Sequence, residues 1–425
     1  MAKEAYYCTV KELNKLGRDA IPAQLRSNTH LIYSSPATLA FNSPGAEGFG
    51  VKRAGLAVPD SIMLIVAPGC CGRNTSLISS MREYDNRFFY LMMDETDIVT
   101  GRHLKKIPKA VEEICNCCEK RPSVVMICIT CVDALLGTDM ERVCRKAEER
   151  AGLPVRPCYM YALTREGRKP PMVHVRQSLY SLLEPKKKKG NVVNLLGFFS
   201  PLIDECELYD LFHSAGVKTI HEISRCKDYE EYQTMSEANF NLVLHPEARF
   251  AAEDFHNRLQ IPFIELRRLY QTDKIASQYQ AFGKVLGVTF SDEVYREKAE
   301  ETVAKFKEKR PEASFAIGEC MNGDPFEMAL AMIKYGFKVP EIYGTLTAEN
   351  FIYLNQLSRL SPETVFSNME PTMLYYDPEK SGVNMTIGKD AGYYHPDQPN
   401  VIWNQDRQPY GYVGVTRLFE TLLEV

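Results

Sequence analysis

The 425-residue chain is predicted to fold into three Rossmann-like α/β domains, each built on a parallel β-sheet. Three observations predict this fold. A short apolar run, a polar loop, an amphipathic segment and a glycine-containing turn recur along the chain in that order, as in a βαβ unit. The runs are apolar at nearly every position, which is typical of strands that helices cover on both faces. The chain is also longer than one hydrophobic core normally organises.

Three copies of this unit are clear in the sequence. Their first strands are expected at 123–129, 192–196 and 313–318, and their helices end near positions 151, 214 and 334. A fourth copy begins at 241–245 and returns to a strand at 261–263. Strands and helices that alternate in this way favour parallel sheets, because each crossover helix covers one face of its sheet.

The domain boundaries are expected where the composition changes. The segment 185–191 holds four consecutive lysines, and such a run repels itself and is typical of a solvated linker, although an anion-binding patch is the alternative. A Lys/Glu-rich helix at 293–309, followed by Arg310 and Pro311, separates the second domain from the third. The predicted domains are therefore 1–188, 191–309 and 310–425.

The composition excludes several classes of protein. The hydrophobic content is 45%, and the net charge of -4 gives no electrostatic reason to expect nucleic acid as a partner. The first residues lack the pattern of a secretory signal, and no apolar run reaches the roughly 18 residues of a membrane span. We therefore expect a cytoplasmic protein without a membrane partner. Thirteen cysteines are many for a reducing compartment, where clustered thiols more often bind metal or do redox chemistry.

Loops at the carboxyl ends of the strands are the expected sites, because parallel sheets bind ligands there. This rule selects cysteines in the first domain, a histidine in the second and carboxylates in the third: Cys70, Cys71 and Cys131, then His245 with the loop 197–200, then Glu319 and Asp324. Cys144, Cys206 and Cys226 lie in helix-like segments and are interpreted as small buried side chains.

The strand-end cysteines do not match a zinc pattern, since no second Cys or His follows either loop at the required spacing. They need further ligands, and a two-fold axis between subunits is one source, because it brings the same pair from a second chain. Cys115, Cys117 and Cys118 end a helix before a strand, away from the carboxyl ends. They are interpreted as structural, and a zinc or redox role would need a partner histidine.

Four motifs together resemble the nitrogenase component 1 superfamily. They are PGCCG at 68–72, DIVTG at 97–101, CVDALLGTD at 131–139 and RQPYGYVG at 407–414, in the family's order over nearly the whole chain. The superfamily includes nitrogenase molybdenum-iron protein subunits, their cofactor-assembly scaffold, light-independent protochlorophyllide reductase, nickel-sirohydrochlorin reductive cyclase and methylthio-alkane reductase. The resemblance implies three Rossmann-like parallel-sheet domains of the nitrogenase component 1 type.

The resemblance also implies a metal site. Cys71, which precedes Gly72, takes the cluster-ligand position together with Cys131, whereas Cys70 takes a family glycine position as a spare ligand or a packing residue. The family's third, upstream cysteine position reads Ser34-Ser35-Pro36, so we expect a 4Fe-4S cluster at a subunit interface rather than an eight-iron cluster. The cofactor ligands of nitrogenase are missing at 243–247 and 402–406, and reduction of dinitrogen with that cofactor is not expected.

The function implied by the resemblance is that of a subunit in an ATP-dependent, anaerobic two-component reductase. A separate ATP-hydrolysing iron protein would deliver electrons to a homodimer, or to a heteromer with a paralogous subunit, which reduces a small molecule. The chain has no Gly-x4-Gly-Lys-Ser/Thr loop of its own, which agrees with this division. His245 would donate protons or bind metal, unless it only caps the following turn. Glu319 and Asp324, with Cys320, Asn322 and the segment 393–395, are candidates for proton delivery or substrate contact.

Other functions stay open at this point. The chain could be a scaffold on which a metallocluster is assembled, a tetrapyrrole-specific reductase, or a regulatory or structural paralogue. Two exposed thiols at strand ends would be oxidation liabilities without a role, which argues against the last alternative. The cysteines do not separate a reductase from a scaffold, and a second metallocluster or a tetrapyrrole in the pocket stays open too.

Overall fold

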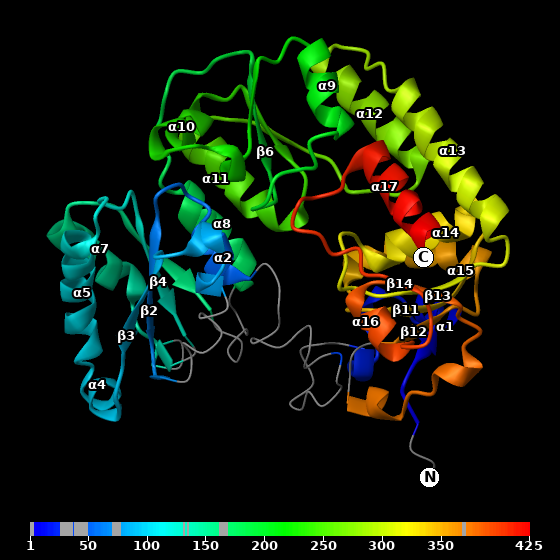
Figure 1. The fold of residues 1–425 in the computed structure, drawn as a ribbon, viewed down its shortest axis with the longest axis horizontal. Coiled ribbons are helices and arrows are strands. Elements are labelled where there is room, and N and C mark those ends of the chain that lie inside the picture. The colour runs from blue at the N-terminus through cyan, green and yellow to red at the C-terminus, as the bar shows by residue number, and fades with distance from the viewer. Residues whose placement is uncertain are drawn as a thin grey trace. The chain divides into compact units, whose positions relative to one another are not determined.

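The structure is a computed structural model with a mixed α/β fold and three β-sheets (Figure 1). It describes residues 4–25, 37, 50–69, 78–130, 132–133, 136–160, 169–367 and 371–425. Contacts divide the chain into two compact units, which are described separately: a two-sheet unit of residues 48–201 and 217–267, and a one-sheet unit of residues 1–47, 202–216 and 268–425. The three predicted domain boundaries stay a prediction. None of the described helices is long and apolar enough to cross a membrane.

The first sheet of the two-sheet unit is entirely parallel, with the strand order β3-β2-β4-β5. Its strands are β2 (Ile62–Ala67), β3 (Phe88–Met92), β4 (Val125–Ile129) and β5 (Val155–Tyr159). β2 and β4 are buried at every position, which explains why their sequences are continuously apolar rather than alternating.

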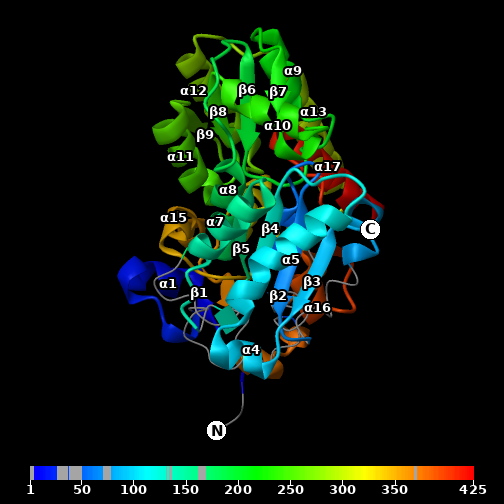
Figure 2. The same cartoon turned by 90° about the vertical axis from the view of Figure 1, so that its left-hand side faces the viewer.

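Helices cover both faces of the first sheet because successive side chains of a strand point to opposite faces. Ile62, Leu64 and Val66 pack in one core with α5 (His103–Cys117) and α7 (Met140–Ala151). The intervening residues Met63 and Ile65 pack in a second core with α2 (Val51–Gly55) and α8 (Pro171–Tyr180). Figure 2 shows α5 lying across the sheet and α4 (Glu95–Thr100) at the corner where the chain enters it.

The second sheet belongs to the same unit and is also parallel, in the order β7-β6-β8-β9. Its strands are β6 (Val192–Leu196), β7 (Thr219–His221), β8 (Phe240–Val243) and β9 (Phe263–Glu265). The helices α10 (Tyr229–Gln233) and α11 (Arg249–Leu259) flank β8 in the chain. Leu196 and Val243 share the second core of the first sheet, so one continuous hydrophobic core joins the two sheets.

The third sheet forms the centre of the one-sheet unit, in the order β1-β12-β11-β10-β13-β14. All its strand pairs are parallel except that of β1 with β12 at one edge. The strands are β1 (Cys8–Thr9), β10 (Ser314–Ile317), β11 (Lys338–Tyr343), β12 (Val365–Ser367), β13 (Met385–Ile387) and β14 (Asn400–Val401).

Aromatic side chains connect the third sheet to its helices. The helices of this unit are α1 (Val10–Leu16), α9 (Glu207–Ser214), α12 (Thr272–Leu286), α13 (Glu293–Lys309), α14 (Pro325–Tyr335), α15 (Phe351–Leu360), α16 (Lys389–Tyr394) and α17 (Gly411–Glu424). The ring of Phe306 on α13 lies 5.6 Å from that of Phe419 on α17 and 6.2 Å from that of Phe315 on β10. Rings at these separations in tilted or edge geometry add to the burial energy.

The predicted strand–helix–strand units are confirmed. The strand expected at 192–196 coincides with β6, and the helix expected at 293–309 coincides with α13. The lysine-rich segment 185–191 has no regular structure, as a linker should, but it is not simply solvated. Lys188 Nζ donates to the carbonyl oxygen of Ser236 at 2.6 Å, and Lys189 pairs with Glu237. The linker is therefore anchored to the turn at 234–237 that precedes β8.

A buried carboxylate binds the backbone in the first turn of the last helix. Glu207 on α9 is completely buried, and it accepts hydrogen bonds from the backbone N of Tyr412 at 2.6 Å and of Val413 at 3.2 Å, in the first turn of α17. The Tyr279 hydroxyl donates to the same carboxylate at 2.8 Å. Gly411 has a φ of +60°, and a Cβ there would lie 1.8 Å from Glu207 Oε1, so only glycine allows this approach. The motif at 407–414 is thereby explained as a helix start.

Replacement of Glu207 by alanine is expected to destabilise the one-sheet unit by about 1–3 kcal/mol, because buried N–H and O–H donors lose their acceptor. Chemical denaturation measures this change. Glu205→Ala is the matched control, since Glu205 is exposed and pairs with Arg417 at 2.9 Å on the surface. Equal stability of the two variants would contradict the role of Glu207.

Candidate functional site

All three sheets contain a topological switch point, where the chain leaves one side of its first strand and continues on the other. The switch points lie between β2 and β4, between β6 and β8, and between β10 and β13. Open α/β sheets bind ligands in the crevice beyond the carboxyl ends of two such strands. Each loop selected from the sequence follows one of the strands at a switch point.

The switch point of the first sheet joins the two cysteine-containing segments. Val66 in β2 pairs with Ile129 in β4, near the carboxyl ends of both strands. Cys70 and Cys71 follow the end of β2, and Cys131 follows the end of β4, but all three lie outside the described residues. What the structure establishes is that these segments leave neighbouring strands at the same edge of the sheet.

The chain after β2 is held by the neighbouring strand β3. The hydroxyl of Tyr90 donates to the carbonyl oxygens of Ala67, at 3.0 Å, and of Pro68. Met92 lies beside Gly69, because a Cβ there would be 3.8 Å from its sulfur. Large apolar side chains are exposed at the end of β3 and on the segments that follow β3 and β4: Met92, Val99 and Leu136. Apolar side chains exposed together mark a contact surface.

The residues on both sides of Cys131 carry buried polar atoms. Asp133 Oδ1 lies 2.9 Å from His103 Nε2 and accepts from the Thr138 hydroxyl at 3.1 Å. Within the described part of the chain, Asp133 Oδ2 and Thr130 Oγ1 have no hydrogen-bond partner although both are buried. Buried polar atoms without partners are rare and call for an explanation.

Asp97, the acid of the motif at 97–101, fixes the corner between α4 and α5. Its carboxylate accepts from Lys106 Nζ at 2.6 Å and from Arg102 Nε at 2.7 Å, and with Asp94 it forms a capping box for α4. The hydrogen bonds from Lys106 and Arg102 lower the pKa of Asp97 to about 2. The motif therefore places a permanent negative charge beside two cations.

The switch point of the second sheet brings His245 against Gly197. Gly197 has a φ of +138°, and a Cβ there would lie 2.7 Å from the backbone N of His245. His245 follows β8 and is 39% exposed at its side chain. Its Nδ1 accepts from the backbone N of Glu247 at 3.3 Å and caps the short turn Pro246–Ala248. The capping role foreseen as an alternative is thus present, and it leaves the proton of the neutral imidazole on Nε2.

Arg176 of α8 holds both loops of this switch point. Its guanidinium donates to the carbonyl oxygen of Gly197 at 2.7 and 3.1 Å and to Glu247 at 2.8 Å, and it lies over the ring of Phe199 at 4.6 Å. Burial lowers the pKa of Arg176, which is only 4% exposed. Sequence analysis missed this residue because no local pattern in α8 distinguishes it.

Asp390 holds the loop at the switch point of the third sheet. Its carboxylate accepts from the backbone N of Glu319 at 2.9 Å and of Cys320 at 3.1 Å. A Cβ on Gly318 would lie 1.9 Å from Asp390 Oδ1, so the close approach depends on glycine. Burial, and then the charge of Glu319, raise the pKa of Asp390 to about 7. Sequence analysis missed Asp390. The apolar residues of β13 directly before Gly388 could have indicated a further strand, and therefore a further strand end next to Asp390.

Glu319 and Asp324 both bind backbone groups of this unit. Glu319 Oε2 accepts from the backbone N of Thr345 at 2.7 Å. Asp324 caps α14 by accepting from the backbone N of Phe326 at 2.9 Å, and its other oxygen accepts from Asn350 Nδ2 at 2.9 Å. The structure thus brings Glu319 and Asp390 together and gives Asp324 a structural task. Their catalytic roles stay predictions.

His395 belongs to a buried polar network away from the switch points. Glu341 on β11 accepts from Tyr343 at 2.6 Å and from Tyr376 at 2.7 Å, and its Oε2 lies 2.8 Å from His395 Nε2. Burial raises the pKa of both phenols, so they stay protonated donors. The hydroxyls of Tyr343 and Tyr376 and the ring of His395 all contact the carboxylate of Glu341, which indicates a structural role.

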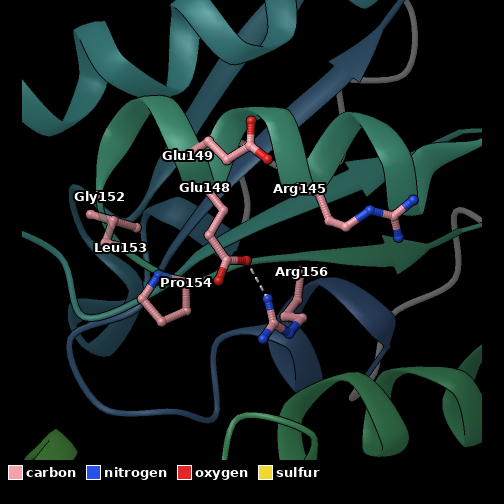
Figure 3. Close-up of a pocket in the computed structure, with 7 residues that line it drawn as sticks. All are labelled: Arg145, Glu148, Glu149, Gly152, Leu153, Pro154 and Arg156. Carbon is pink, nitrogen blue, oxygen red and sulfur yellow. Dashed lines mark hydrogen bonds and ion pairs between the residues drawn. The ribbon is translucent and has the colours of Figure 1, made fainter.

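Two surface cavities lie away from the switch points. One has a volume of about 590 Å³ and lies beside the turn at 152–154, where the chain enters the amino end of β5. Figure 3 shows the residues that line it. It is lined by Arg145, Glu148, Glu149, Gly152, Leu153, Pro154 and Arg156, with an ion pair of 2.6 Å between Glu148 and Arg156. The second, of about 540 Å³, lies between α12 and α13. In the described residues, no three His, Cys, Asp or Glu side chains are grouped to hold a metal.

Comparison with known proteins shows which family the sequence matches. The family profile described as "Nitrogenase component 1 type Oxidoreductase" matches residues 47–416. The chain belongs to this family. The resemblance drawn from the four motifs is therefore confirmed, and so is the expected α/β class built on parallel sheets, although the third sheet has one antiparallel pair at its edge.

Relatives of this nitrogenase component 1-type chain include two kinds of protein. The nitrogenase iron-molybdenum cofactor biosynthesis protein NifE of Rhizobium meliloti (strain 1021) is 28% identical over 224 residues, 51% of this chain and 47% of that protein. The nitrogenase molybdenum-iron protein alpha chain of Methanosarcina barkeri is 24% identical over 270 residues, 60% of this chain and 49% of that protein. The chain spans about half the length of the curated relatives it matches.

A solved structure titled "Nitrogenase Cp1 at pH 6.5" has the same fold. It superposes with a TM-score of 0.71 over 96% of this chain and 95% of that chain, at 17% identity. At this identity the likeness concerns the fold alone. It supports the architecture of the component 1-type chain and leaves its chemistry to the residues at the switch points.

We expect Glu319→Gln to change how stability depends on pH. The raised pKa of Asp390 means that the folded state binds more protons than the unfolded state between about pH 4 and 7, so stability falls as the pH rises through this window. Removal of the Glu319 charge lowers the pKa of Asp390, and the protein should gain of order 1 kcal/mol at pH 8 for each unit of that decrease.

Urea denaturation between pH 5 and 8 measures this effect. Glu349→Gln, at an exposed carboxylate of the same unit, serves as the control and should leave the profile unchanged. A profile of Glu319→Gln that parallels the wild type would show that the charge of Glu319 does not reach Asp390.

Proposed function

We propose that the chain is a subunit of a nitrogenase-like assembly which holds an iron-sulfur cluster through Cys71 and Cys131 and acts as a scaffold on which a metallocluster is built or passed on. The single observation that carries this proposal is the parallel pairing of β2 with β4, after which the two cysteine segments leave the sheet. Two thiolates there are half of the four that a 4Fe-4S cluster needs.

Chain length limits where these thiols can lie. Cys131 follows the last residue of β4 by two positions, and Cys71 follows the last residue of β2 by four. At no more than about 3.6 Å per residue, these short separations limit how far either thiol can lie from the end of its strand. Thiolates are the ligands that iron-sulfur clusters prefer.

A second subunit completes the site in this proposal. The apolar side chains exposed at this edge, among them Met92 and Val99, suit a contact between a second copy or a paralogous subunit and this chain. A two-fold axis through such a contact brings two more cysteines to the cluster. The two polar atoms without partners in the described part of the chain, Thr130 Oγ1 and Asp133 Oδ2, also fit a site that another group completes.

The relatives favour a scaffold over a reductase. NifE of Rhizobium meliloti and NifE of Clostridium pasteurianum, 24% identical over 217 residues, are both named for biosynthesis of the iron-molybdenum cofactor. The second candidate is the catalytic subunit of a reductase that receives electrons from an ATP-hydrolysing iron protein and reduces a small molecule. The match to the molybdenum-iron protein alpha chain over 60% of this chain favours it.

In either function, His245 would act at the edge of the second sheet. Glu319 and Asp324 would act at the edge of the third sheet. His245 would present the proton on Nε2 to a bound cluster or substrate, or bind metal through Nε2 once the proton has moved to Nδ1, which would give up the cap on the backbone N of Glu247. Glu319 lies beside Asp390, whose pKa of about 7 allows a carboxyl group to exchange protons near neutral pH. Asp324 would act by holding the start of α14, which it caps.

Cys71→Ser and Cys131→Ser should each lower the iron content of anaerobically purified protein from about four irons per dimer toward zero, because a serine hydroxyl is a poor iron ligand. Iron analysis and electron paramagnetic resonance measure the loss. Cys117→Ser is the matched control, since Cys117 is exposed at the end of α5 and should leave the iron content unchanged. Full iron content in both ligand variants would refute the assignment.

Two assays on the loaded protein separate the candidate functions. A scaffold should pass iron to a cluster-free nitrogenase component 1 protein without consuming ATP. A reductase should instead support ATP hydrolysis and electron flow from an added nitrogenase iron protein. ATP-dependent turnover without any transfer would replace the scaffold proposal by the second candidate.

His245→Asn should separate the two tasks of this residue. The asparagine Oδ1 can still accept from the backbone N of Glu247, so we expect the free energy of unfolding to change by less than about 0.5 kcal/mol. Cluster transfer or substrate reduction should fall by about 10²-fold if the imidazole donates a proton. His245→Ala is the comparison variant and should lose both. Unchanged activity in the Asn variant would reduce His245 to a cap.

A further inference from the structure

We infer that Arg268 and Tyr410 form a binding site for the anionic oxygen group of a small molecule, a carboxylate or a phosphate, in the one-sheet unit. The site is separate from the cysteines of the first sheet and does not depend on an iron-sulfur cluster. Tyr410 ends the segment 402–410, which connects β14 to α17 (Figure 1). It belongs to the motif at 407–414, whose part as a helix start uses Gly411 and the backbone beyond it but not the phenol.

The Tyr410 hydroxyl is a buried polar group. Tyr410 is 1% exposed, and within the described part of the chain its Oη has no hydrogen-bond partner. Buried hydroxyls normally find a partner, because an unmet hydroxyl keeps the full cost of its desolvation. Burial also raises the pKa of this phenol well above its usual value, so it stays protonated at neutral pH. Tyr410 therefore offers a donor that a ligand oxygen can accept.

Arg268 brings a positive charge to this hydroxyl. Its guanidinium donates to Gln408 Oε1 at 2.6 Å, and Gln408 lies two positions before Tyr410 on the same segment. Burial lowers the pKa of Arg268. Tyr270 and Tyr410 favour its charged form, but burial raises the pKa of both phenols, so neither supplies a negative charge at neutral pH. An anion bound beside Arg268 would favour the charged guanidinium.

The two side chains together select a class of ligand. A guanidinium donates through several N–H groups in one plane, and this fork matches two oxygens of a carboxylate or of a phosphate. The phenol adds a further donor. The carboxylate of Glu207 also acts on Tyr410, but it is bound by the first turn of α17 and by Tyr279. Arg268 is only partly buried, so the site is not sealed from solvent.

The segment that leads to the phenol is held in a strained conformation. Trp403 has a φ of +44°, which is unfavourable for a bulky side chain. Its carbonyl oxygen accepts from the backbone N of Asn322 at 2.7 Å, and its Nε1 donates to the Tyr270 hydroxyl at 2.6 Å. Asn322 Nδ2 also donates to Gln408 Oε1, at 3.3 Å. Strained residues that their surroundings hold in place cluster at ligand sites, so the strain supports a binding role independently of the hydroxyl.

Trp403 gives the site its own signal, because it is the only tryptophan in the sequence. We expect the tryptophan fluorescence of the full-length protein to change when sodium phosphate or sodium succinate is added, but not with sodium chloride at the same ionic strength. A response to phosphate alone supports a phosphate group as the ligand, and a response to succinate alone supports a carboxylate. A protein that responds to neither anion, or equally to chloride, would overturn the inference.

Tyr410→Phe removes only the hydroxyl. We expect the half-saturating anion concentration to rise about 2–10-fold, which is the range for one lost hydrogen bond. The urea midpoint of the ligand-free protein should stay at or above that of the wild type, because no hydrogen bond among the described residues is lost. Tyr232→Phe is the matched control in the two-sheet unit. The buried hydroxyl of Tyr232 donates to the carbonyl oxygen of Leu179 at 2.6 Å, so this variant should lower the midpoint and leave anion binding unchanged.

Two variants of Arg268 separate its charge from its fork geometry. Arg268→Met removes the charge and should raise the half-saturating concentration by about 10–100-fold, whereas Arg268→Lys keeps the charge and should have a smaller effect. Tyr410→Phe keeps the test valid if Arg268→Met does not fold.

Wild-type anion affinity in both Tyr410→Phe and Arg268→Lys would overturn the inference. A lower urea midpoint of Tyr410→Phe with unchanged anion binding would also overturn it, because the phenol would then be structural. The iron content of these variants should equal that of the wild type. Loss of iron in the cysteine variants therefore tests the cluster proposal without affecting this one, and the two can fail separately.

Discussion

The order of the strands is the constraint on which the candidate site depends. In each sheet the chain lays strands to one side of a first strand and then crosses to the other side. Parallel pairing places the carboxyl ends of the two strands at this crossing next to each other, and the loops that follow cannot pack against a common helix. The position of each candidate binding or catalytic residue at a sheet edge follows from that arrangement.

A buried polar side chain from a helix contacts the chain that follows each switch point. His103 at the start of α5 binds Asp133 in the first sheet, Arg176 of α8 binds Gly197 and Glu247 in the second, and Asp390 of α16 binds the backbone of Glu319 and Cys320 in the third. Buried loop backbone needs partners, and a side chain from a neighbouring helix supplies them where no strand can. The described loop residues at the second and third switch points are thereby bound to a helix of the same unit.

The chemistry differs among the three edges although the architecture repeats. The first carries the cysteine segments and an exposed apolar surface, the second a histidine and an arginine-carboxylate pair, and the third two neighbouring carboxyl groups. A shared fold does not assign a reaction, so the proposal of a cluster-holding subunit depends on the thiols at the first edge and on the family of the chain.

The sequence by itself determined the α/β class, the positions of the main strands and helices such as β6 and α13, and the edge of each sheet where function should lie. These follow from local periodicity, which the chain carries within each short segment. Only the tertiary structure decided the order of the strands, and with it which loops are neighbours. It also revealed His103, Arg176 and Asp390, and the capping roles of Asp324 and His245. The partners of these side chains lie far away in the sequence or in the backbone, and a pattern of residue types does not record which distant groups meet.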